Sequence, residues 1–331
     1  MFTNKYDLSP SIAVWLAADF YDHNEDINYI SVTELLKSPR QLILRSRATE
    51  EGITDISSQV ASAMGTGIHE HIHQAWLMHY KQAMLDLGYK EKDIRRIKIN
   101  PEVVEENDIP VYMEQRVIKQ IGNYWIGGKF DMIMNGQLED YKTTGVYSYI
   151  KKSNTDKFRL QGSMYRWLNP DKITNDIMLI QYIFLNWEAA KVSAKPESNY
   201  PKFKIVADPI KLLSIEETER WVTDKLTLLD SLQDTPEPEL PLCTKEELWQ
   251  DDPSYAYYKN QAKMARATKV FPNYYEAHQR YLADGSVGVI QERPCTVRAC
   301  LFCGVSSLCT QKDQYIAAGL LNIPTTLGFA G

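Results

Sequence analysis

Hydrophobic positions recur at helical spacing in two N-terminal stretches of the chain. Residues 31–47 offer Ser31 or Thr33 as an N-cap, followed by apolar residues three to four positions apart. Pro39 interrupts this pattern and predicts a break or two short helices, because proline lacks the amide hydrogen that a helix interior needs. A second helix is predicted from about residue 58 to residue 87.

The pattern changes to strand-like alternation between Ile109 and Asp140. Three stretches alternate there: residues 111–118 (VYMEQRVI), 123–134 (NYWIGGKFDMIM) and 137–144 (QLEDYKTT). Asn135-Gly136 separates the last two, and this dipeptide is the strongest short signal for a hairpin. The sequence therefore predicts three antiparallel strands in a meander.

Helices and strands alternate after this meander. Four elements are predicted: a helix over 156–168, a strand over 176–187, a strand over 202–212 and a helix over 214–232. The two strands are expected to pair, and Ser214 forms a capping box with Glu217 at the start of the last helix. This order indicates an α/β (α+β) fold with a mixed central sheet flanked by helices.

A proline-rich segment at 234–242 is typical of a linker. We expect residues 1–233 to form the core of the protein. Residues 234–331 are expected to form the linker and a helical C-terminal lobe, which carries the cysteines.

The composition is that of an ordinary globular protein. The chain has 331 residues, 44% hydrophobic and 24% charged, which excludes a mostly disordered, collagen-like or polytopic membrane protein. The first twenty residues have no clear cleavage site and an apolar stretch broken by Asp19, so we expect no secretory signal and a cytoplasmic protein. A net charge of −6 argues against a strongly basic nucleic-acid binder but is compatible with a nucleic-acid enzyme.

Two carboxylates and a lysine are expected to meet at the end of the meander. Asp131 lies late in one strand, and Asp140 lies late in the next strand, across the hairpin. Lys142 follows two residues later and therefore shares a sheet face with Asp140. Carboxylates that hold Mg²⁺ or Mn²⁺ beside a lysine suit phosphodiester hydrolysis. The structural alternative is a set of strand-end polar residues and a solvated lysine.

Several motifs around these residues occur in a characteristic order. They are Gly65-Thr66-Gly67-Ile68-His69-Glu70, Gly128-Lys129-Phe130-Asp131, Asp140-Tyr141-Lys142-Thr143-Thr144 and Gln161-Gly162-Ser163-Met164-Tyr165. With them the chain, roughly from Ile30 to Cys309, resembles the PD-(D/E)XK nuclease superfamily. It is most similar to the RecB-like branch, which includes CRISPR-associated iron–sulfur exonucleases and many phage nucleases.

The resemblance implies a restriction-endonuclease-like core and a Mg²⁺- or Mn²⁺-dependent deoxyribonuclease that acts as an exonuclease. Its partner would be DNA with single-stranded or free ends, in recombination, repair or phage DNA metabolism. A phage-encoded protein would act in the host cytoplasm.

The resemblance also assigns roles to individual residues. It implies that His69 ligates the metal together with Asp131 and Asp140, while Lys142 assists the attacking water. It implies that Gln161 and Tyr165, four residues apart on one helix face, bind DNA or brace the active site; an ordinary amphipathic helix is the alternative. Glu114, in the first strand of the meander, is either a carboxylate that supports the metal ligands or a half-exposed strand residue.

The cysteines are confined to the C-terminal part of the chain. The first 242 residues contain none, and Cys300, Cys303 and Cys309 then lie close together. Three clustered thiols in a reducing compartment favour a metal or cluster site and need a fourth ligand, either Cys243 or Cys295. Free buried thiols are the alternative.

The resembled exonucleases hold a 4Fe-4S cluster with one cysteine from an N-terminal helix and three from the C-terminus. Here the N-terminal region reads LLKSPRQ, with Ser38 and no cysteine. We favour Cys243 as the fourth ligand, because PLCTKEELW resembles a variant found in phage members. Spacing alone does not separate an iron–sulfur cluster from structural Zn²⁺.

Three other functions fit parts of the sequence. His69-Glu70-His71-Ile72-His73 contains the HExxH signature of zinc proteases, although a third ligand such as His79 stands at no recognisable spacing. A nuclease fold that binds DNA or a partner without cleaving is the second, and a sequence-specific endonuclease is the third. We predict a metal-dependent DNA exonuclease.

Overall fold

The chain forms two compact units in a computed structural model that describes residues 2–19, 24, 26, 28–48, 54–194 and 196–322. The first, here called the core unit, comprises Met1–Leu36 and Glu51–Thr227. The second, the cysteine unit, comprises Lys37–Glu50 and Leu228–Gly331. The boundary at residue 234 between a core and a C-terminal domain stays a prediction of the sequence.

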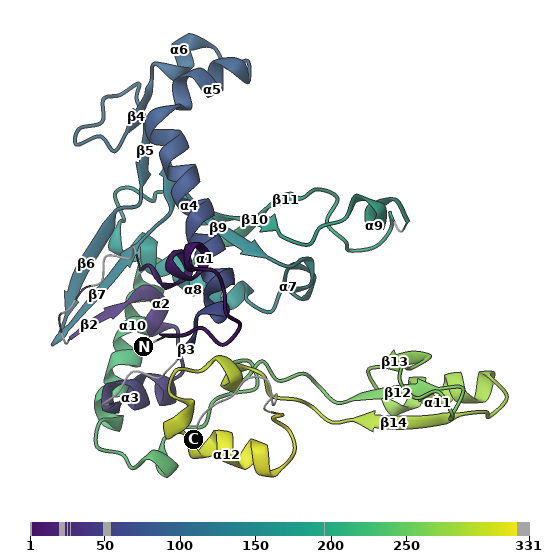
Figure 1. The fold of residues 1–331 in the computed structure, drawn as a ribbon. Coiled ribbons are helices and arrows are strands. Elements are labelled where there is room, and N and C mark those ends of the chain that lie inside the picture. The colour runs from purple at the N-terminus through teal and green to yellow at the C-terminus, as the bar shows by residue number, and fades with distance from the viewer. Residues whose placement is uncertain are drawn as a thin grey trace. The chain divides into compact units, whose positions relative to one another are not determined.

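A mixed six-stranded sheet forms the centre of the described core unit (Figure 1). Its strands in spatial order are β11 (Ile205–Lys211), β10 (Ile177–Phe184), β9 (Gln137–Thr144), β8 (Met132–Met134), β5 (Ile109–Met113) and β4 (Ile97–Ile99). β9 and β10 run parallel, whereas β10 pairs with β11 antiparallel, as the sequence predicts for these two strands. The α/β (α+β) fold class with a mixed sheet is confirmed.

The predicted three-stranded meander is wrong. The first stretch breaks at Glu114, whose φ of 51° turns the chain out of β5 and into β6 (Arg116–Ile121). The second breaks at Phe130 and Asp131, between β7 (Tyr124–Lys129) and β8. β6 and β7 therefore pair in a separate sheet of order β2-β7-β6, which includes β2 (Tyr29–Ser31). The Asn135-Gly136 hairpin between β8 and β9 is confirmed, with positive φ at both residues.

Most predicted helices form, with shifted ends. Those of the core unit are α1 (Pro10–Ala17), α2 (Val32–Leu35), α4 (Val60–Met78), α5 (Tyr80–Asp86), α6 (Glu91–Ile94), α7 (Val146–Lys151), α8 (Thr155–Leu168), α9 (Ala189–Ala194) and the greater part of α10 (Ile215–Leu232), whose last residues, from Leu228, belong to the cysteine unit. The helix expected over 58–87 is divided at His79, which leaves the helical region of φ and ψ. The capping box of α10 forms as predicted, with Ser214 and Glu217 each accepting the other's backbone N–H.

Helices cover both faces of the central sheet. Tyr141, with Val111, Met113 and Met132, packs against the side chains of α4 and α5. Asp140 and Lys142 point to the other face because side chains alternate along a strand, and α8 covers that face. The predicted active-site residues of β9 thus lie between the sheet and α8.

The cysteine unit joins an N-terminal helix to the C-terminal part of the chain. It contains α3 (Pro39–Arg47), α11 (Tyr274–Ala283), α12 (Thr310–Ala317), a sheet of order β13-β12-β14 and 3₁₀ turns. The strands of that sheet are β12 (Ser254–Tyr258), β13 (Lys269–Phe271) and β14 (Val289–Arg293). α3 begins at Pro39, so the predicted break in 31–47 is confirmed. Arg47 donates to the carbonyl groups of Leu232, Gln233 and Thr235 and so ties α3 to the later chain.

None of the described helices combines the length and the apolar character that a membrane-crossing helix needs.

Close packing of α8 on the sheet depends on Gly162. A Cβ there would overlap Met178 Sδ and approach Leu212 Cδ2 at 2.9 Å, whereas a Cβ at Gly67 in α4 would meet no described atom within 4 Å. We therefore expect Gly162→Ala to lower the free energy of unfolding by about 1–3 kcal/mol. The matched change Gly67→Ala should leave stability unchanged or raise it by up to ~1 kcal/mol. Urea unfolding of both variants measures this, and equal destabilisation by the two would contradict the packing.

Candidate active site and thiol pocket

The candidate active site lies where β9 continues beyond its neighbour β8. β8 pairs with β9 only as far as Glu139, so the backbone of Tyr141 lacks a strand partner on that side. Two side chains take the partner's place. Tyr141 N–H donates to Asp131 Oδ2 at 2.7 Å, and Tyr141 O accepts from His69 Nε2 at 3.0 Å. The open strand edge therefore positions Asp131 and His69.

The contact with Tyr141 O fixes how His69 presents its ring. A carbonyl only accepts, so Nε2 carries the proton and Nδ1 is turned toward Asp131 Oδ1, 3.4 Å away. Burial lowers the pKa of His69, but the hydrogen bond and charge of Asp131 outweigh it and raise that pKa above its ordinary value. A proton and a cation would therefore compete for the electron pair of Nδ1.

Glu114 completes a set of three candidate ligands. One side-chain atom each from His69, Glu114 and Asp131 lies within 4.8 Å of the other two, and no other such set occurs among the described residues. Glu114 stands at the break between β5 and β6, and its N–H donates to Asp131 O at 3.2 Å. Its Oε2 contacts Lys129 Nζ at 2.7 Å. One imidazole and two carboxylates fit Mg²⁺ or Mn²⁺ by donor type.

Buried Asp140 and partly buried Lys142 form an ion pair beside these three residues. Asp140 is 1% exposed, and its Oδ2 lies 2.6 Å from Lys142 Nζ. Burial raises the pKa of Asp140 to about 6; Lys142 lowers it and Asp131 raises it further. Burial lowers the pKa of Lys142, but the two carboxylates more than offset this and raise it. Asp140 is outside the three-residue set, so its role as a metal ligand stays a prediction.

Gln161 and Tyr165 hold Asp140 from α8. Gln161 Nε2 donates to Asp140 Oδ1 at 3.2 Å and lies 3.1 Å from the Tyr165 hydroxyl. Both side chains are buried. This geometry favours bracing of the active site over direct contact with DNA, the two functions that the resemblance implies.

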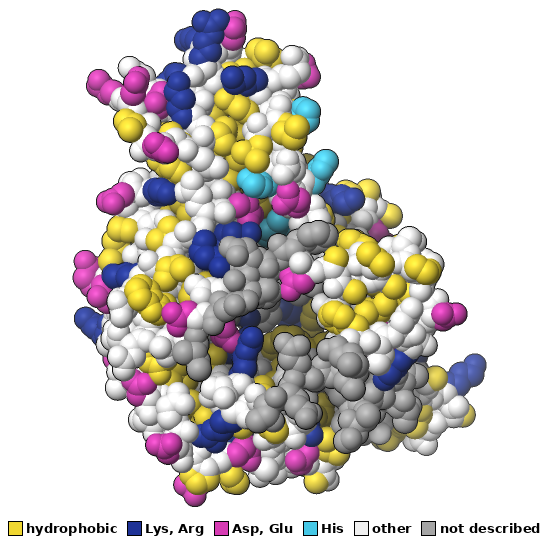
Figure 2. All heavy atoms as spheres, turned by 60° about the vertical axis from the view of Figure 1, so that its left-hand side comes forward, with side chains coloured by type: hydrophobic (Ala, Val, Ile, Leu, Met, Phe, Trp, Pro, Cys, Tyr) yellow, Lys and Arg dark blue, Asp and Glu magenta, His cyan; other side chains and the backbone are white. Residues whose placement is uncertain are grey.

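The HExxH residues do not converge on one site in the described structure. Figure 2 shows histidine and acidic side chains beside one another on the face that carries α4. The candidate ligand set takes His69 from the motif but not His73, and Glu70 is exposed and accepts a hydrogen bond from Gln74. The protease hypothesis therefore gains no support from the geometry.

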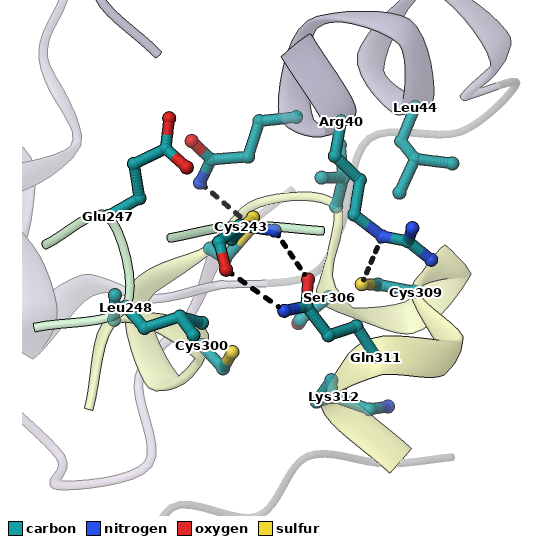
Figure 3. Close-up of a pocket in the computed structure, with 14 residues that line it drawn as sticks. Arg40, Leu44, Cys243, Glu247, Leu248, Cys300, Ser306, Cys309, Gln311 and Lys312 are labelled. Atoms are coloured by element: carbon teal, nitrogen blue, oxygen red, sulfur yellow. Dashed lines mark hydrogen bonds between the residues drawn. The ribbon is translucent and has the colours of Figure 1, made fainter. Parts of the chain in front are cut away.

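Four cysteines line one pocket of the cysteine unit (Figure 3). They are the predicted ligands Cys243, Cys300, Cys303 and Cys309. Gln311 fixes the backbone of Cys243, because its side chain accepts from Cys243 N–H and donates to Cys243 O. Cys295 is not a lining residue; its Sγ lies 3.1 Å from Gln250 Nε2.

The start of α3 supplies hydrogen bonds to three of the four sulfur atoms. Ser38 Oγ lies 3.3 Å from Cys243 Sγ, Gln41 Nε2 donates to Cys303 Sγ at 3.3 Å, and Arg40 Nε donates to Cys309 Sγ at 3.2 Å. Ser38 and Gln41 also form the capping box of α3, which fixes both side chains. Donors aimed at sulfur are the environment that bound thiolates need.

Burial in the pocket disfavours the thiolate forms of Cys243 and Cys300. Burial raises the pKa of Cys300 to about 11, and the neighbouring thiols add to this effect. Burial also raises the pKa of Cys243, while its contact with Ser38 lowers it. A cation among the sulfurs would reverse this preference.

Comparisons with known proteins add little. No family profile and no curated protein matches the sequence. The solved structure of SSO0001 is 16% identical, with 65% of this chain and 81% of that one covered and a TM-score of 0.39. A phage-related exonuclease from Haemophilus somnus 129PT is 12% identical, with 38% of this chain and 61% of that one covered and a TM-score of 0.24.

The ligand set predicts which side chains bind a cation. His69→Ala removes a donor atom and Glu114→Gln removes a negative charge, so each should weaken Mn²⁺ binding at least about tenfold. His71→Ala, on the exposed side of α4, should leave binding unchanged. Isothermal titration of metal-free protein with Mn²⁺ measures the three variants. Wild-type affinity in Glu114→Gln would exclude Glu114 and favour Asp140 in its place.

The pocket predicts a fourth cysteine ligand. Cys243→Ser should lose bound metal and lower the melting temperature, because a centre that joins Cys243 to Cys300 closes a long loop. Cys295→Ser is the matched control and should keep both. Iron, sulfide and zinc analysis and thermal unfolding check this. Loss of the metal in Cys295→Ser but not in Cys243→Ser would show that the ligand is misassigned.

Proposed function

We propose that this protein is a Mg²⁺- or Mn²⁺-dependent deoxyribonuclease that hydrolyses DNA from its ends. The observation that supports this best is the convergence of His69, Glu114 and Asp131 beside the ion pair of Asp140 and Lys142. Carboxylate and imidazole groups that can bind a metal, next to the ammonium group of Lys142, match what phosphodiester hydrolysis requires. The exonuclease activity rests on the family resemblance.

Each residue of the candidate site has a separate role in the proposed reaction. A bound divalent cation would neutralise the phosphate and lower the pKa of water. His69, Glu114 and Asp131 would hold that cation. Lys142, kept protonated by Asp140, would stabilise the charge that develops on the phosphate and orient the attacking water. Gln161 and Tyr165 keep Asp140 in place and so act through it.

We also propose that the four pocket cysteines hold one structural metal centre, a 4Fe-4S cluster rather than Zn²⁺. Among the described residues no three of these sulfurs lie within 4.8 Å of one another, which is wide for sulfurs at ~2.3 Å from one zinc ion. The cavity between them is about 20 Å³, which is small for a cluster. The wide sulfur spacing favours a cluster, whereas the small cavity favours a zinc ion. We choose the cluster because of the family resemblance.

The proposed active site predicts a large loss of activity on two substitutions. Lys142→Ala and Asp140→Asn should each slow DNA hydrolysis more than about a hundredfold, since each removes at least ~3 kcal/mol of transition-state stabilisation. Lys191→Ala and Asp176→Asn remove the same groups from exposed positions and should leave the rate unchanged. The assay is digestion of end-labelled single- and double-stranded DNA with Mn²⁺.

The products of the same assay distinguish the alternatives. Mononucleotides or short oligonucleotides indicate an exonuclease, whereas discrete fragments indicate a sequence-specific endonuclease. Near-normal cleavage by Lys142→Ala would reject the site. DNA binding without any cleavage by the wild-type protein would favour a catalytically silent nuclease fold.

A further inference from the structure

A cavity of about 210 Å³ lies in the core unit on the side of Lys142 that faces α7 and α8. One water molecule needs only ~10–15 Å³ of such space, so the cavity has room for a small organic group. Its lining residues are Lys142, Thr143, Thr144, Ser148, Asn154, Phe158 and Tyr182. Lys142 thus borders both the candidate metal site and this cavity.

Three polar side chains of the lining form no hydrogen bond with any other described residue. Thr144, Ser148 and Asn154 are all partly buried, and none of their side chains makes a hydrogen bond within the described part of the chain. Asn154 is the residue before α8 and yet does not cap it. Partly buried hydroxyl and amide groups that face a common space without partners are suited to bind a polar ligand.

Aromatic rings and a cation form the rest of the wall. The rings of Phe158 and Tyr182 have centroids 6.4 Å apart at 63°, and Lys142 Nζ lies 5.3 Å from the centre of the Phe158 ring. Tyr182 pairs in register with Lys142 on the neighbouring strand. The cavity therefore offers a planar apolar surface, hydrogen-bonding groups and one positive charge within a single space.

We propose that this cavity is a nucleotide subsite, which holds one nucleoside monophosphate unit with its phosphate at Lys142 and its base against Phe158. The charge of Lys142 matches a phosphate, the aromatic surface matches a base, and the unpaired polar groups match the sugar and base edges. The proposal rests on the proposed function, because it makes this unit the nucleotide next to the bond that is cleaved. A free mononucleotide carries the same chemistry.

Binding of small probes to the full-length wild-type protein in EDTA tests the subsite without hydrolysis. The probes are dTMP, thymidine and inorganic phosphate, measured by isothermal titration. We expect dTMP to bind at least tenfold more tightly than either part alone. Equal affinity for phosphate and dTMP would overturn the nucleotide subsite.

Two variants locate the binding. Ser148→Trp fills the cavity, and Asn154→Leu removes a polar group without removing a helix cap. Both should weaken dTMP binding at least tenfold, whereas Ser193→Trp on exposed α9 is the matched control and should not. Mn²⁺ affinity and melting temperature should stay near those of the wild type in Asn154→Leu. Wild-type dTMP affinity in both cavity variants would overturn the proposal.

Hydrolysis of a short oligonucleotide with Mn²⁺ separates the subsite from the proposed function. Asn154→Leu should raise KM at least tenfold with little change in kcat, because it weakens binding and leaves the reacting groups in place. Unchanged KM in an active enzyme would overturn the subsite and leave the nuclease proposal standing. No hydrolysis by the wild-type protein, together with dTMP binding that Asn154→Leu weakens, would support a nucleotide site and reject the nuclease.

Discussion

The early end of β8 determines the geometry of the candidate site. β9 runs on past Glu139 without a neighbour on that edge, so the N–H and C=O of Tyr141 need partners from elsewhere. Asp131 and His69 supply them. The same two contacts orient a carboxylate and an imidazole ring toward one point. A backbone requirement in the sheet thus places the side chains on which the proposed chemistry depends.

Glu114 reaches that point through an unusual backbone conformation. Its positive φ directs the chain from one sheet to the other and brings its carboxylate beside Asp131. Such a conformation is unfavourable for a residue with a Cβ and persists only where the surroundings enforce it. Nothing in the alternating pattern of VYMEQRVI shows this break. From the sequence alone, Glu114 is therefore predicted only as a neighbour of the metal ligands.

Local signals in the sequence predict local structure well and sheet assignment poorly. The Asn135-Gly136 turn, the Ser214–Glu217 box and the break at Pro39 depend on a few adjacent residues, and all three are present in the structure. The predicted meander is wrong because two of its predicted strands each divide between two sheets. That division depends on tertiary pairing with β2 and β8. His69, Asp131, Asp140 and Lys142 could be named in advance because ordered motifs identify them. The polar groups around the cavity carry no motif.

Ser38 explains how the thiol pocket differs from the pattern of the resembled exonucleases. Its hydroxyl group, which stands where that pattern expects an N-terminal cysteine, lies 3.3 Å from Cys243 Sγ. The thiol of Cys243, from the later part of the chain, thus lies beside the N-cap of α3. Arg40, 1% exposed, pairs with Glu237 while it donates to Cys309 Sγ, so its charge is already balanced. Lys312, which also lines the pocket, could balance only one of four thiolates, so a bound cation would be needed to offset the remaining negative charge. Metal binding and close packing of this unit are therefore expected to depend on each other.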